Sequence, residues 1–151
     1  MPTKNTGFEM ELIERMLAEH SLNPPAKRVE LAVERRLFLK RRWRGTAEDG
    51  REFGFDLDSR LVDGCVIFRD GGMDYVVRQL PETVYEVPFE DAAHGALVGW
   101  KVGNLHLPAQ VTDAALRVLH DGAMKQLLER EGWPYSEPVV IFTPMKAVAH
   151  A

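Results

Sequence analysis

Gly103-Asn104-Leu105-His106-Leu107-Pro108 lies at the centre of the stretch that decides the fold, residues 84–142. Proline forbids a continuing helix, so the hexapeptide is predicted to be a turn between two elements. The segments on either side alternate between strand and helix patterns: a strand at 84–87, a helix within 89–102, strands near 109–111 and 115–119, a helix over 121–131 and a strand at 139–142. This β-α-β-β-α-β order predicts a ferredoxin-like domain.

Residues 28–81 carry only β signals. Val29, Leu31 and Val33 alternate with polar neighbours at the two-residue period of a half-buried strand. Glycine-containing turns at 47–50 and 69–72 each separate two short strand-like runs, and a basic strand is expected at 35–44. Short strands with such turns predict a small β-rich domain, a barrel or a sandwich.

The segment before residue 28 has a different pattern. Phe8, Leu12 and Met16 form one stripe at helical spacing, which predicts an amphipathic helix over residues 8–22 that ends at the prolines after Asn23. We therefore expect an α+β protein with a helical extension at 1–27, a β-rich domain at 28–81 and a ferredoxin-like domain at 82–151.

Composition narrows the class of protein. The chain has 151 residues, a net charge of −4 and one cysteine, Cys65. No internal disulfide is possible, and no signal peptide or membrane-spanning run is visible, so a soluble cytoplasmic protein is expected. The acidic balance disfavours a dedicated nucleic-acid binder. No nucleophile elbow, acid–base pair or phosphate-binding loop is present, so we do not expect an enzyme.

Metal binding is the chemistry that the histidines suggest. His106 stands in the turn, and a single imidazole cannot hold a transition metal. A two-fold axis would supply the same imidazole from a second subunit and create a shared site. The alternative is that Asn104 and His106 only satisfy backbone groups of the turn. His120, which precedes a predicted helix N-cap at Asp121, and His150, near the C-terminus, are secondary candidates.

The basic run at residues 35–44 supports a competing function. Its six cations are interleaved with aromatic residues, a composition that can bind RNA or an acidic protein. The same alternation fits a solvated edge strand protected from aggregation, which is the interpretation we favour. A non-metal interaction module that docks an acidic protein or RNA through 35–44 is thus the alternative to a metal carrier.

The chain resembles the urease accessory protein family UreE. The hexapeptide is similar to the Gly-Asn-x-His-x-Pro signature of that family, and residues 109–111, 116–118 and 120–121 continue the match. Asp49-Gly50-Arg51-Glu52 is similar to the pattern of its first domain. The resemblance covers about residues 29–145.

This resemblance implies a nickel metallochaperone with a peptide-binding-like N-terminal domain and a C-terminal domain that forms a homodimer. His106 from both subunits would bind Ni²⁺, with His150 and His120 as further candidate ligands, although imidazoles also suit Zn²⁺ and Cu²⁺. The implied partners are the GTPase UreG and apo-urease with its other accessory proteins. Two helpers found in some relatives are missing, because Lys101 and Gly122 stand where those relatives have histidine.

Overall fold

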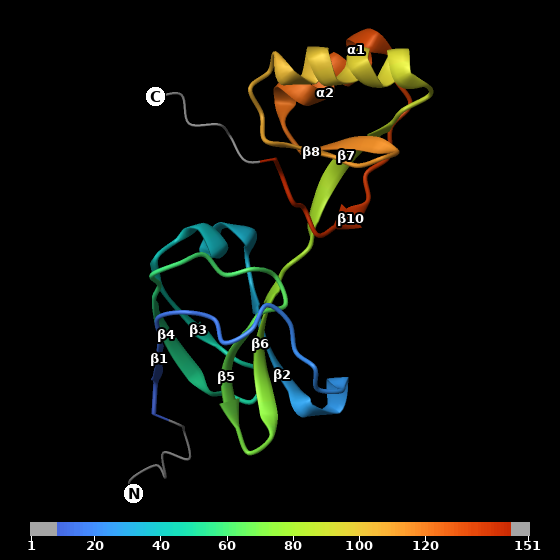
Figure 1. Cartoon of the computed structure of the whole chain (residues 1–151). Coiled ribbons are helices and arrows are strands. Elements are labelled where there is room, and N and C mark those ends of the chain that lie inside the picture. The colour runs from blue at the N-terminus through green and yellow to red at the C-terminus, as the bar shows by residue number, and fades with distance from the viewer. Residues whose placement is uncertain (1–8, 146–151) are drawn as a thin grey trace, which may run out of the picture. The chain divides into compact units, whose positions relative to one another are not determined.

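The chain divides between Leu80 and Pro81 into two units, and a computed structural model describes residues 9–145. Figure 1 shows the strands of the first unit and the helix-covered sheet of the second. No helix within the described range is long and apolar enough to cross a membrane.

The first unit consists of two three-stranded sheets around one core. One sheet has the order β1-β4-β3 and the other β2-β6-β5. Phe53 and Trp43 from the first sheet share this core with Leu31, Tyr75 and Val77 from the second. The strands are β1 Glu11–Ile13, β2 Arg28–Val33, β3 Arg42–Thr46, β4 Glu52–Asp56, β5 Val66–Asp70 and β6 Met73–Gln79, and two 3₁₀ turns, η1 Pro25–Lys27 and η2 Arg35–Leu39, complete the unit. The β3–β4 and β5–β6 hairpins fall where the sequence predicts them.

The predicted helix over residues 8–22 is wrong for its described part. Residues 11–13 form β1, which pairs parallel with β4, and the backbone of Leu17 and Ala18 bonds to Val66 of β5. Leu12 of the predicted stripe is exposed, whereas its neighbour Ile13 is buried and Met16 packs against the core, so the stripe and the buried residues do not coincide. Pairing of this segment with the edges of β4 and β5 is a tertiary contact, and such contacts outweigh a weak helical preference.

The basic strand predicted over residues 35–44 is also wrong as one element. Phe38 and Trp43 are both buried in the same core. Their separation of five positions would place them on opposite faces of a continuous strand. The 3₁₀ turn η2 breaks the strand alternation before β3 begins, so that both aromatic side chains point to the core.

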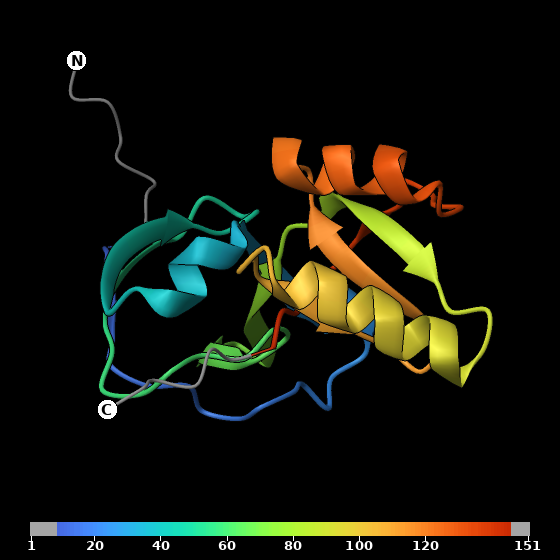
Figure 2. The same cartoon turned by 90° about the horizontal axis from the view of Figure 1, so that it is seen from above.

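The second unit has the predicted β-α-β-β-α-β order. Its elements are β7 Glu82–Pro88, α1 Ala92–Gly103, β8 Ala109–Val111, β9 Ala115–Leu119, α2 Gly122–Glu131 and β10 Val139–Val140. The sheet order is β10-β7-β9-β8 with every neighbouring pair antiparallel, as in a ferredoxin-like fold. Both helices cover one face of this sheet (Figure 2), where Val98, Val102, Leu127 and Leu128 pack on the inner residues of the strands.

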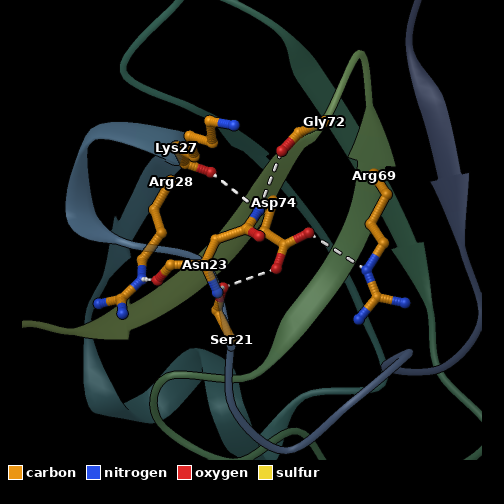
Figure 3. Close-up of polar contacts among 7 residues, drawn as sticks. All are labelled: Ser21, Asn23, Lys27, Arg28, Arg69, Gly72 and Asp74. Carbon is orange, nitrogen blue, oxygen red and sulfur yellow. Dashed lines mark hydrogen bonds and ion pairs between the residues drawn. The ribbon is translucent and has the colours of Figure 1, made fainter.

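A buried carboxylate on β6 holds the segment before β2 against the rest of the first unit (Figure 3). Asp74 of β6 accepts hydrogen bonds from the Ser21 hydroxyl at 2.6 Å and from Arg69 Nε at 3.1 Å. Asn23 adds a second anchor, because its side-chain amide donates to the carbonyl of Gly72 at 2.9 Å. These bonds explain how a charged group that is only 5% exposed is tolerated.

Replacing Asp74 by alanine should destabilise the first unit. Hydrogen bonds to a charged group contribute roughly 1.5–3 kcal/mol, so we expect the free energy of unfolding to fall by about 2 kcal/mol. Urea denaturation followed by circular dichroism measures this change. Glu19→Ala removes an exposed carboxylate from the same segment and serves as the control; equal losses in both variants would contradict the assignment.

Candidate metal centre

His106 occupies an unusual backbone conformation just after α1. Its φ is 57°, and it is the one non-glycine residue with positive φ within residues 9–145. The left-handed region costs an L-residue roughly 1 kcal/mol that glycine avoids. His106 N–H donates to the carbonyl of Gly103 at 3.2 Å, which closes the turn that follows the helix.

The imidazole of His106 is available to a ligand. The residue is exposed, and across the described chain no hydrogen bond, ion pair or ring contact involves its side chain. The turn around it is closed by backbone bonds from Asn104, Leu105 and His106 to carbonyls of the last turn of α1. The alternative in which the histidine serves to satisfy backbone groups of the turn therefore has no support in this geometry.

The helix that carries this turn presents an apolar face to solvent. Asp91 caps α1 by accepting from His94 N at 2.7 Å, and Val98 and Val102 point into the core. Lys101 is the single Asp, Glu, Lys or Arg within α1, and its ammonium contacts Glu131 Oε1 of α2 at 2.5 Å. The remaining exposed positions are all apolar or glycine: Ala92, Ala93, Ala96, Leu97, Trp100 and Gly103. We call Ala93, Ala96, Leu97 and Trp100 the α1 face.

Sequence reasoning did not identify which apolar residues of this helix stay exposed. The apolar spacing of residues 89–102 indicated packing, whereas Trp100 is 68% and Leu97 42% exposed. The available signal was the near absence of charge around the whole helix, since a helix that is apolar all round needs a second surface to cover it. The charge of Lys101, the single cation of α1, is paired with Glu131 of α2.

His120 lies beyond the same end of the β8–β9 ladder as His106. Ala109 pairs with Val118, so His106 comes three residues before that pair and His120 two residues after it. The His120 ring stacks on Tyr85 at 4.3 Å between centroids, and its Nε2 lies 3.1 Å from Glu137 Oε1. Nδ1 is the nitrogen that this arrangement leaves for another ligand.

The end of the described chain returns to the same region. After β10, Thr143 N donates to Gln110 Oε1 at 3.1 Å and Met145 N donates to the carbonyl of Ala109 at 2.8 Å. His150 lies outside the described residues. His150 is five positions after Met145, and a segment of that length spans at most about 17 Å when extended.

The other histidines have structural surroundings. His94 Nδ1 accepts from Glu90 N at 3.2 Å, and its ring stands edge-on to Trp133. His20 is exposed in the segment before β2. No three His, Cys, Asp or Glu side chains within residues 9–145 of one chain are grouped so that they could hold an ion. A site centred on His106 consequently needs ligands from a second subunit or from residues after 145.

Two other reactive groups are part of the first core. Burial raises the pKa of the Cys65 thiol, which favours the protonated form over the thiolate that metals and electrophiles require. Burial and the neighbouring Asp49 carboxylate raise the pKa of Tyr75 to about 12. The guanidinium of the buried Arg51 lies 5.1 Å from the centre of the Tyr75 ring and 2.7 Å from Asp70. These groups are tied into packing and ion pairs of the β-rich unit.

Comparison with known proteins gives one consistent result. A family model described as the UreE urease accessory protein, C-terminal domain, matches residues 82–151. The urease accessory protein UreE of Chelativorans sp. is 32% identical over 107 residues, which are 70% of this chain and 68% of the relative. The UreE of Geobacillus kaustophilus is 32% identical over 117 residues, 76% and 78% of the two chains. The UreE of Bacillus cereus is 29% identical over 124 residues, 80% and 82% of the two chains.

Proposed function

Because this chain belongs to the UreE family of urease accessory proteins, nickel chaperones of urease maturation and not enzymes, we propose that it carries Ni²⁺ at a site shared by two subunits. His106 from each chain supplies the central ligands. The observation that carries this proposal is the backbone of His106, which holds an unpartnered imidazole in a conformation that favours glycine. Local strain of this kind is retained where a side chain has a function.

The α1 face provides the surface on which two subunits meet. A charge-poor patch centred on an exposed tryptophan has the composition of an interface core. Trp100 lies six positions before His106 on the same helix-turn segment, so an isologous contact through α1 brings two copies of this turn toward one axis. The partner subunit thereby completes a metal site that one chain lacks.

Two further histidines are candidate ligands, one near the C-terminus and one directly after β9. His150 is a candidate because Met145, only five positions earlier, is held against β8 by its hydrogen bond to the carbonyl of Ala109. His120 is a weaker candidate, since one of its nitrogens is engaged by Glu137. A set of a few imidazoles binds Ni²⁺, Zn²⁺ and Cu²⁺, with copper favoured intrinsically, so delivery of nickel depends on availability and on partner recognition.

The cargo passes to apo-urease together with UreG and the other accessory proteins. A site of few, exposed imidazoles suits this role, because a carrier must release its ion to the next protein. The cytoplasm is the proposed location, and Cys65, the single cysteine of the chain, is a free thiol there.

Titration of dialysed protein with Ni²⁺, combined with mass measurement by light scattering, tests the proposal. We expect a particle of twice the 17.1 kDa chain mass and a high-affinity step at half an ion per chain. A dimer that takes up no nickel would contradict the site. A monomer that binds nickel with the same affinity would contradict the shared arrangement.

A further inference from the structure

A hollow with basic side chains and an apolar floor lies entirely within the first unit. Its volume is about 180 Å³, below the roughly 300–1,000 Å³ of small-molecule sites, so it suits one side chain of a larger ligand. Phe38 and Leu57 are buried and form the floor, while Leu39 is 60% exposed at the rim. The remaining lining residues are polar: Lys40, Arg41, Asp58, Ser59 and Arg60.

The charges around this hollow are unevenly balanced. The Asp56 carboxylate is 3.0 Å from Arg41 Nε and 3.4 Å from Arg42 Nε, so a single negative charge pairs with two positive charges. Asp58, the single acid in the lining, is 2.9 Å from Arg15 Nη2. Lys40 and Arg60 are exposed and have no ion-pair partner among the residues that the structure describes. The hollow therefore combines an uncompensated positive rim with an apolar base.

The aromatic residues of the basic run are not available for base stacking. Trp43 is buried and stacks on Phe55 with 3.8 Å between ring centroids, and Phe38 is only 9% exposed. Single-stranded nucleic acid is held by exposed aromatic platforms together with a basic groove. Here the exposed apolar group beside the cations is Leu39, an aliphatic side chain, which favours a protein ligand over RNA.

We propose that this hollow is a docking site for an acidic segment of a partner protein, with one apolar side chain of that segment seated on Phe38 and Leu57. Carboxylates on either side of the apolar residue would face Lys40 and Arg60. Charge complementarity at such a rim speeds association and selects the partner, while the seated side chain slows release. This surface belongs to the first unit and does not depend on the nickel site.

Fluorescence anisotropy with the full-length chain tests the proposal. The probe is a short fluorescein-labelled peptide of glutamates around one central leucine, and the comparison probes are the same peptide with serine for leucine and labelled poly(U). We expect the leucine peptide to bind more tightly than either comparison probe, with affinity that falls as salt rises. Failure of the leucine peptide to bind, or tighter binding of poly(U), would overturn the assignment.

Charge reversal locates the binding surface. The double variant Lys40→Glu, Arg60→Glu should weaken binding of the leucine peptide roughly tenfold or more, since two attractive contacts become repulsive. It should also gain affinity for a peptide of lysines around one leucine, a result that an unfolded variant would not give. Arg44→Glu reverses one exposed cation on β3 outside this hollow, half the charge change of the double variant, and is the control. Equal loss in the control would show a general charge effect and overturn the site, and nickel uptake should be the same in all three proteins.

Discussion

His106→Ala should abolish the high-affinity nickel step while the protein remains a dimer. In the proposed site each subunit gives one imidazole, so a single substitution removes two ligands from the shared ion. Loss of even an outer partner of a metal ligand lowers affinity roughly 10- to 100-fold, and loss of both central ligands should exceed that range. Calorimetric titration with Ni²⁺ measures the affinity, and light scattering reports the dimer.

His106→Gly separates metal binding from backbone conformation. Glycine adopts a φ of 57° without the penalty of a side chain. We expect this variant to lose nickel as completely as His106→Ala and yet to be roughly 1 kcal/mol more stable than the alanine variant. Wild-type nickel affinity in either variant would remove His106 from the site. Equal stabilities of the two variants would show that the left-handed backbone is not strained.

The second unit could be predicted from the sequence because its local signals agree with its tertiary structure. Asp121 stands where a helix N-cap is expected, and its carboxylate accepts from Ala123 N and Met124 N of α2. The Asp49-Gly50 turn of the first unit was predictable for the same reason, since Gly50 has a φ of 90°. In both places the residue type is demanded by the local backbone, so no knowledge of distant contacts is needed.

The two wrong predictions in the first unit concern segments whose structure is decided by contacts with residues distant in the sequence. Residues 11–13 become a strand because β4 offers them an edge to pair with, and that edge cannot be read from their own sequence. The turn at residues 35–39 is set by the need to bury Phe38 and Trp43 on one side. Periodicity describes a segment in isolation, and these segments are shaped by the core they join.

The candidate site was predictable in part. The hexapeptide identifies His106 as the residue of interest, but neither its left-handed backbone nor its free imidazole follows from residue types. The α1 face is hidden from sequence for a related reason. Leu97 and Val98 are adjacent and equally apolar, and only the packed structure shows that Val98 is buried while Leu97 faces solvent. Which apolar residues remain for a second subunit is a property of the folded unit.

Trp100→Glu should convert the dimer to a monomer and thereby weaken nickel binding without touching a ligand. Truncation of an interface tryptophan commonly costs roughly 2–4 kcal/mol of binding free energy. A carboxylate adds more, because the two-fold axis brings two like charges onto the same apolar patch. The fold of each unit should persist, since the Trp100 side chain is 68% exposed and contributes little to the core.

Light scattering across a dilution series measures the monomer–dimer equilibrium, and nickel titration of the same samples measures the ion. Val139→Glu is the control, because Val139 is 65% exposed on β10, at the opposite edge of the sheet from β8. That variant should remain dimeric and bind nickel as the wild type does. A dimeric Trp100→Glu protein would exclude the α1 face as the interface, whereas a monomer with undiminished nickel affinity would show that the ion is held within one chain. Loss of both dimer and nickel at unchanged His106 is the result that ties the metal to the pairing of subunits.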